Sequence, residues 1–172
     1  MRRFLRLLDQ SLFDSLLEKA SELDRKRCAL NLHTSFEEHV QRVVIAMHSS
    51  SYVRPHLHQA PQPFELFIVL KGEVDVLLFD DMGHLLARHA LVAGSSTCGI
   101  EISQGQYHSL VAKMSGVVFL EVKQGPFHID APRYYAEWAP SEGDAMAQFY
   151  LEWLSCAEVG QRFDVNLGKC LS

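Results

Sequence analysis

The chain has 172 residues and a formal net charge of −5 at pH 7, with 48% hydrophobic and 22% charged residues. This composition is typical of one globular domain and excludes a disordered chain, a coiled-coil rod and a collagen-like repeat. The negative charge argues against nucleic acid as a partner, because binding to phosphates needs a basic surface. No apolar run approaches the ~20 residues of a membrane span, so we expect no membrane partner.

Residues 1–39 are predicted to form a helical segment ahead of the main domain. Apolar residues recur at three- and four-residue spacing over residues 9–27, which indicates an amphipathic helix. Ser11 is expected to cap its start, and basic residues fill its last turn, where the helix dipole favours them. The basic opening of the chain is expected to lead into this helix and not to be a secretory signal, because Asp9 and Asp14 interrupt the apolar stretch.

Residues 40–122 are predicted to form an antiparallel β-barrel, so the expected fold class is mainly β with helices at both ends. Short runs rich in β-branched and aromatic residues alternate there with turn residues such as Gly, Asp and Ser. The predicted strands are 40–47, 64–70, 73–79, 85–91, 107–112 and 117–122. Several short strands with no helix between them favour a sandwich or a small barrel.

Residues 123–172 are predicted to pack on the outside of this barrel. A loop rich in proline and aromatic residues spans 123–140, and Ser141 is expected to cap a final helix. The apolar face of that helix is predicted to consist of Ala145, Phe149, Leu151, Trp153 and Leu154. Both alternate faces of the strand 64–70 are largely apolar, and two terminal helices cannot easily cover every such face. We therefore expect a homodimer.

The cysteines indicate the compartment. Cys28, Cys98, Cys156 and Cys170 are scattered along the chain with no close pair. That spacing fits neither a disulfide framework nor a thiolate zinc site. Reduced thiols and a cytoplasmic location are therefore predicted.

The residues that carry chemistry begin with two histidines, His56 and His58. Residues two apart in a strand point to the same face, so both rings aim at one point. After a turn, the strand bearing Glu65 is expected to return antiparallel, so that its carboxylate faces the rings. His108 is the best candidate for a fourth ligand from a different strand. Imidazoles and a carboxylate converging in a cavity form a site for one divalent ion such as Fe, Mn, Ni or Zn.

Further polar and aromatic residues are candidates for the surroundings of that ion. The polar ones are Arg54, Tyr107, His33, Lys113 and Glu101. Arg54 suits a carboxylate or a phosphate of a ligand. In the loop 123–140, Tyr134, Tyr135 and Trp138 are expected either to stack on a sugar at the barrel mouth or to seal the core. Catalytic residues stay unassigned, because no activated nucleophile, nucleotide-binding loop or paired-carboxylate signature appears.

The spacing of the ligand candidates resembles two motifs of the cupin superfamily. The matching residues are His56-x-His58, Glu65 and Gly72 for the first motif, and Gly105-x-x-His108 for the core of the second. The resemblance implies a cupin-type jelly-roll barrel in which three histidines and one glutamate bind a divalent metal ion.

A closer resemblance, from about residue 27 to 142, is to the WbuC-type cupin-fold metalloproteins. It is carried by Arg54-Pro-His-x-His58, Phe79-Asp-x-x-Gly83, Glu121-Val-Lys-x-Gly-Pro126 and Trp138-Ala-Pro-x-Glu142. Those are bacterial proteins often encoded among genes for surface polysaccharide (O-antigen) synthesis. Two functions are compatible with the residues. One is a metal-dependent isomerase, epimerase or oxygenase acting on a sugar or sugar nucleotide, and the other is a non-catalytic cupin that binds a small carbohydrate-like ligand.

Overall fold

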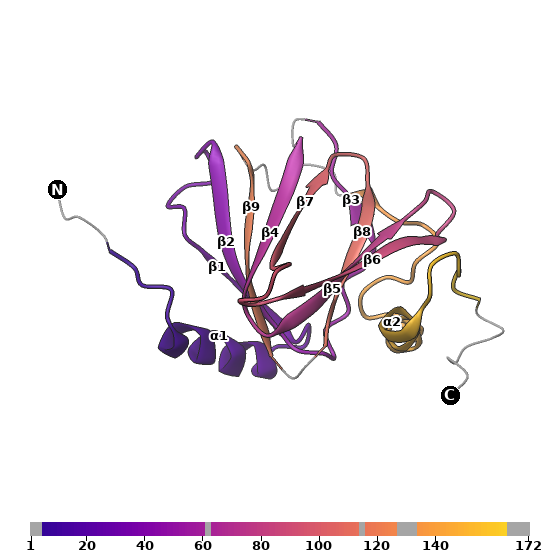
Figure 1. The fold of residues 1–172 in the computed structure, drawn as a ribbon, viewed down its shortest axis with the longest axis horizontal. Helices are drawn as coiled ribbons and strands as arrows, with labels where there is room; N and C mark the ends of the chain where they lie inside the picture. The colour runs from indigo at the N-terminus through magenta and orange to yellow at the C-terminus, as the bar shows by residue number, and fades with distance from the viewer. Residues whose placement is uncertain (1–4, 61–62, 114–115, 127–133, 165–172) are drawn as a thin grey trace.

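The computed structural model describes residues 5–60, 63–113, 116–126 and 134–164. Within them the chain forms two antiparallel five-stranded sheets, which stand as two layers (Figure 1). The first sheet contains, in spatial order, β1 (Arg27–Asn31), β2 (Val40–Met47), β9 (Val117–Gln124), β4 (Phe64–Lys71) and β7 (Gly99–Ser103). The second contains β10 (Tyr134–Tyr135), β3 (His56–Leu57), β8 (Tyr107–Ala112), β5 (Glu73–Phe79) and β6 (Leu85–Val92). The predicted mainly β architecture is confirmed.

Helix α1 (Gln10–Glu22) packs on the outer face of the first sheet. The contact is formed by Phe13, Leu16 and Ala20 of the helix and by Val44, Ala46 and Val118 of the sheet. The N-cap is Asp9, whose carboxylate accepts a hydrogen bond from the Leu12 N–H at 3.0 Å. The prediction that Ser11 caps this helix is therefore wrong.

Strand β1 lies within the segment 1–39, which the sequence predicts to be helical. The helix stops at Glu22, and β1 pairs with β2 in antiparallel register. Along β1, Cys28 is buried against α1, whereas Arg27, Ala29 and Asn31 line an internal cavity. Alternate residues of β1 thus have a place to be buried on each face, which favours a strand. This strand lies outside the segment predicted for the barrel.

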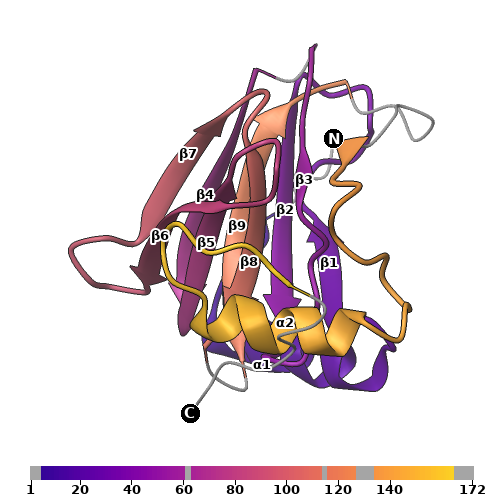
Figure 2. The ribbon, with the colours of Figure 1, turned by 90° about the vertical axis from the view of Figure 1, so that its right-hand side faces the viewer.

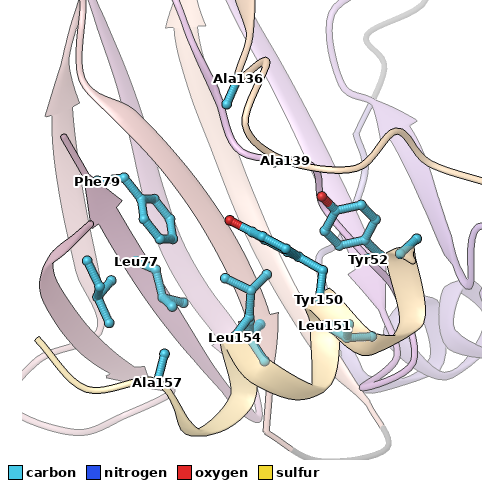
Figure 3. Packing of buried hydrophobic residues seen from close by; sticks show 12 residues of the cluster. Tyr52, Leu77, Phe79, Ala136, Ala139, Tyr150, Leu151, Leu154 and Ala157 are labelled. Carbon is cyan, nitrogen blue, oxygen red and sulfur yellow. The ribbon is translucent and has the colours of Figure 1, made fainter. Parts of the chain in front are cut away.

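Helix α2 (Ala147–Cys156) covers the outer face of the second sheet (Figure 2). Tyr150 and Leu151 pack with Leu77 and Phe79 of β5 in one apolar cluster (Figure 3). Burying a large apolar side chain contributes about 1.5–3 kcal/mol, so this cluster holds the helix on the sheet.

The start and the buried face of α2 differ from the prediction. Residues 141–146 form turns, and Ser141 does not cap the helix but accepts a hydrogen bond from Arg54 at 3.0 Å. Phe149, predicted on the buried face, is 45% exposed. The buried positions are Ala147, Tyr150, Leu151 and Leu154. They follow the three- and four-residue spacing of one helix face, which Phe149 does not share.

The apolar clusters on the two outer faces each include a helix, α1 on the first sheet and α2 on the second. The uncovered strand faces that motivated a homodimer are therefore largely covered by the chain itself. The homodimer stays a prediction without that support.

Two smaller expectations concern cysteines and membranes. Cys28 and Cys98 carry free thiols, whereas Cys156 is disulfide-bonded, so the prediction of reduced thiols is wrong at Cys156. Neither helix of the described chain has the length and apolar character that crossing a membrane requires.

Alternation along β4 and β9 divides the interior between the sheets into an apolar part and a charged part. The inward residues are Val69, Phe67 and Glu65 in β4, and Phe119, Glu121 and Lys123 in β9. The apolar residues join one core cluster, and the charged ones line a cavity of about 500 Å³. The strands that build the core thus also deliver charges to the cavity.

Candidate metal centre

Four side chains from both sheets bring their donor atoms together in the cavity. They are His56, His58, Glu65 and His108, and their candidate ligand atoms all lie within 4.8 Å of one another. His56 and His108 are direct partners across β3 and β8 of the second sheet, whereas Glu65 comes from β4 of the first. The structure therefore brings together all four residues that the sequence indicated.

The sequence suggested that a hairpin brings Glu65 back to the two histidines. In the structure the four side chains meet across the interior, between the two sheets. Strand β3 pairs with β8 and β10, whereas β4 pairs with β9 and β7. The chain after His58 therefore crosses from one sheet to the other. Glu65 meets the imidazoles face to face because the two sheets are packed against each other.

Backbone carbonyls orient two of the rings. His56 Nδ1 lies 2.9 Å from the Arg54 carbonyl oxygen, and His108 Nδ1 lies 3.0 Å from that of Gln106. Since a carbonyl oxygen only accepts, Nδ1 carries the hydrogen and a neutral ring presents its Nε2 lone pair. Such a carbonyl contact is the usual way in which a metal-binding histidine is held in its tautomer.

Glu65 presents its two oxygens to different partners. Oε2 lies 3.1 Å from Nε2 of both His58 and His108, and Oε1 lies 3.6 Å from Lys123 Nζ. The contact with His108 has hydrogen-bond geometry. The contact with His58 is equally close but poorly aligned, so the buried His58 Nε2 has no hydrogen-bond partner among the described residues.

The electrostatics favour an ionised carboxylate beside a neutral ring. Burial by itself raises the pKa of Glu65, but the His108 and His58 rings and the Lys123 charge outweigh it and hold that pKa well below its usual range. Burial, reinforced by the neighbouring His108, lowers the pKa of His56 to about 3. The imidazole of His56 is therefore neutral at pH 7, which is the form that binds a metal.

These atoms fit a divalent cation. A neutral His108 ring turns its Nε2 lone pair toward an ionised oxygen of Glu65 only 3.1 Å away, and the two repel unless a proton or a cation lies between them. The unpartnered Nε2 of His58 faces the same oxygen. Three imidazole nitrogens and one carboxylate oxygen suit Fe, Mn, Ni or Zn.

Arg54 and His33, two of the predicted surrounding residues, line the cavity. The Arg54 guanidinium lies over the Tyr135 ring, with its central carbon 5.3 Å from the ring centroid. His33 Nδ1 accepts a hydrogen bond from the Arg42 backbone N–H at 3.1 Å, and the residue is only 7% exposed.

The other three predicted surrounding residues do not line the cavity. Lys113 pairs with the buried Asp75 at 2.7 Å, and Glu101 is exposed on β7. Tyr107 packs against Trp138. Its neighbour His108 faces the interior, and adjacent residues of a strand point to opposite faces. Tyr107 therefore cannot also face the metal centre.

Glu121 and Lys123 are polar residues of the cavity that the sequence analysis did not assign to the site. Lys123 Nζ lies 2.5 Å from Glu121 Oε1, and both side chains are largely buried. Burial raises the pKa of Glu121, the charge of Glu65 raises it further, and Lys123 partly opposes both. Alternation from the buried Phe119 was the signal that places both residues on the inward face.

A family described as a domain of unknown function, DUF6016, matches residues 8–91. None of the curated proteins matches this chain. Among solved structures, the capsular polysaccharide assembling protein CapF from Staphylococcus aureus is similar at 16% identity with a TM-score of 0.53. That match covers 63% of this chain and 30% of the CapF chain.

Two further solved structures are more distant in shape. A cupin superfamily protein from Desulfitobacterium hafniense DCB-2 is 16% identical with a TM-score of 0.46, over 61% of this chain and 85% of that one. KdgF from a Halomonas species is 14% identical with a TM-score of 0.48, over 62% of this chain and 84% of that one. At these identities a likeness concerns the fold alone. The two packed antiparallel sheets, with a helix near each end of the described chain, confirm the predicted fold class.

Proposed function

We propose that this protein binds one divalent metal ion through His56, His58, Glu65 and His108 and presents it to a small polyhydroxylated ligand. The observation that carries the proposal is the convergence of oriented Nε2 atoms and an ionised carboxylate in a cavity of about 500 Å³. Cavities of about 300–1,000 Å³ are usual for small-molecule sites.

The donor set indicates the chemistry of the site. An ion that prefers six ligands keeps open positions beside four protein donors, where it can polarise a carbonyl or lower the pKa of bound water. The chain's own residues orient the ligand. Tyr134 and Tyr135 line the cavity and offer aromatic faces to a sugar, whereas Trp138 packs with Phe79 and Tyr107.

One observation favours catalysis over binding alone. Glu121 and Lys123 line the same cavity, form a close carboxylate–ammonium pair, and are not proposed metal ligands. An acid–base pair beside open coordination positions is what an isomerase or an epimerase of a sugar or sugar nucleotide needs to move a proton. An oxygenase, the third candidate, would depend on the open positions of the metal ion. A metal-dependent binding protein needs no such pair, and it is the alternative.

The biological setting rests on the resemblance to WbuC-type proteins, and we propose a role in bacterial surface-polysaccharide synthesis in the cytoplasm. CapF is by name a capsular polysaccharide assembling protein, which is in keeping with this setting although the likeness concerns the fold alone. A homodimer remains part of the proposal. Sedimentation that finds only a monomer at micromolar concentration would remove it.

Elemental analysis of tag-free protein, followed by calorimetric titration with simple sugars and sugar nucleotides, tests the proposal. We expect about one metal ion per chain and ligand binding tighter than millimolar. Any turnover detected should be lost in Glu121→Gln while metal content is kept. Absence of stoichiometric metal would overturn the metal centre. Binding without turnover, unchanged in Glu121→Gln, would leave the non-catalytic alternative.

A further inference from the structure

The cavity has a second charged region, which we call the arginine end. It consists of Arg25, Arg27, Arg54 and Glu142, all of which line the cavity. Three guanidinium groups face a single carboxylate among these residues, so two positive charges remain in excess. The chain as a whole carries −5. A local charge opposite to that of the molecule attracts ligands of the opposite sign into a cleft.

Arg27 is a largely buried cation of the arginine end. Its Nη1 donates to the Ser51 hydroxyl at 3.0 Å and to the Tyr52 carbonyl at 2.8 Å, and its Nη2 pairs with Glu142. Burial lowers the pKa of Arg27, and Glu142 opposes this shift. A guanidinium stays protonated in proteins, so its charge persists in the cavity.

Glu142 cannot neutralise the arginine end, because it is shared. Its Oε2 accepts from Arg25 Nε at 2.7 Å, while Oε1 contacts both Arg25 and Arg27. Arg54 forms no ion pair with it; its Nη groups donate to the Ala136 carbonyl at 2.7 Å and the Ser141 hydroxyl at 3.0 Å. Among the described residues, Arg54 therefore donates to neutral acceptors and pairs with no carboxylate.

Arg54 also connects the arginine end to the metal centre. Its guanidinium lies over Tyr135, and the Tyr135 ring centroid is 6.1 Å from that of His56. The carbonyl of Arg54 orients the same His56 ring. The Nη contacts hold Arg54 in place at the cavity lining. A guanidinium group fixed in this way is suited to binding an oxyanion.

We propose that the ligand of this cavity is an anionic sugar, whose carboxylate or phosphate binds at the arginine end while its hydroxyl groups reach the metal centre. The inference rests on the proposed function and adds the class of ligand. Guanidinium groups bind both kinds of oxyanion through charge-assisted hydrogen bonds. A neutral sugar would leave the excess positive charge of the arginine end without a counter-charge.

The test is calorimetric titration of the metal-loaded protein with glucuronate, glucose 1-phosphate and neutral glucose. We expect at least one anionic probe to bind ~10-fold or more tightly than glucose, as one hydrogen bond to a charged group implies. The affinity for that probe should weaken as salt is added, while glucose binding should not. The two anionic probes distinguish a carboxylate from a phosphate.

Three variants make the assignment specific. Arg54→Gln should weaken binding of the anionic probe by ~10-fold or more and leave glucose binding unchanged. Glu142→Gln should act in the opposite direction and tighten it, because it removes the carboxylate that competes with the ligand. Arg42→Gln is the matched control, since Arg42 pairs with Glu38 outside the cavity lining and should change neither affinity. If Arg54 had only a structural role, Arg54→Gln and Glu142→Gln would not change the affinity for the anionic probe in opposite directions.

Arg54 also holds Ala136 and Ser141 in place, so its replacement can disturb the fold. Arg25→Gln changes a more exposed side chain and is the second variant. It should weaken anion binding several-fold. Equal affinity for all three probes, or no binding of any anionic probe, would overturn the inference while stoichiometric metal keeps the metal centre intact. Failure of the protein to bind metal would overturn the proposed function. Anion binding by that metal-free protein, lost in Arg54→Gln, would still support the arginine end.

Discussion

Asp75 and Glu65 are both buried carboxylates with basic side chains around them. Asp75 is an anchor that holds two elements of the fold together, whereas Glu65 belongs to the candidate metal centre. Asp75 on β5 is 1% exposed and pairs with Arg88 and Lys113. Arg88 Nη2 also donates to two carbonyls at the end of α2, at 2.5 and 3.0 Å. This cluster ties the helix to the sheet, and none of its three charged residues lines the cavity that holds Glu65.

Glu65 is buried to a similar degree, at 3% exposed, but a polar atom beside it lacks a hydrogen-bond partner among the described residues. It lines the cavity, and the His58 Nε2 atom beside it has no hydrogen-bond partner in the described chain. Buried charge by itself therefore does not identify a functional site. Unmet donors and lone pairs that face an accessible cavity do, because they require an ion or a ligand to complete them.

The largest expected effect is loss of metal when the incomplete cluster loses a ligand. His58→Ala should lower metal affinity more than ~100-fold, because even residues that only support a ligand contribute 10–100-fold. Elemental analysis after dialysis measures the loss. His89→Ala, at an exposed position of β6, is the matched control and should keep its metal. Stoichiometric metal in His58→Ala would show that other residues bind the ion.

Breaking the anchor should affect stability instead. Asp75→Ala leaves Arg88 without its carboxylate, and removing one partner of a buried pair costs about 3–5 kcal/mol. Urea denaturation measures the change in the free energy of unfolding. Metal content should stay unchanged in the folded variant. A loss below about 1 kcal/mol, or a loss of metal, would contradict the division between anchor and site.

A pH titration of the metal-free protein should report the buried His56 ring. Burial lowers its pKa to about 3, so between pH 6.5 and 3 the unfolded chain binds a proton that the folded chain excludes. Stability should therefore fall as the pH is lowered from about 6.5, by at most about 1.4 kcal/mol per pH unit from this ring. His56→Gln should reduce the slope between pH 6.5 and 5, and an unchanged slope would contradict the assignment.

The smallest expected effect lies in the apolar cluster under α2. The buried Tyr150 hydroxyl has no hydrogen-bond partner in the described structure. Tyr150→Phe should therefore be neutral or stabilise the fold by up to about 1 kcal/mol. Tyr52→Phe is the counterpart, because the Tyr52 hydroxyl donates to the Pro140 carbonyl at 2.8 Å and its loss should cost about 1 kcal/mol. Thermal unfolding distinguishes the two, and equal losses would refute the difference.

Much of the fold could be predicted because local patterns carry it. The runs over 40–47 and 73–79 coincide with β2 and β5, since alternating β-branched residues flanked by turns favour strands in any context. Short strands such as β3 and β10 have two residues each and no periodicity to detect. The helix predicted to reach residue 27 ends at Glu22, and residues 23–26 form a turn that leads into β1, whose partner β2 lies outside any local window.

By itself the sequence determined the donor set and the kind of fold: His56, His58, Glu65 and His108 are recognisable from residue type and spacing. Only the tertiary structure decided which other charges join them. Lys113 forms an ion pair with Asp75, whereas Lys123 and Arg27 line the cavity. Alternation separates the two faces of a strand, but which face becomes interior depends on how the sheets pack. That packing is settled by contacts between residues far apart in the chain.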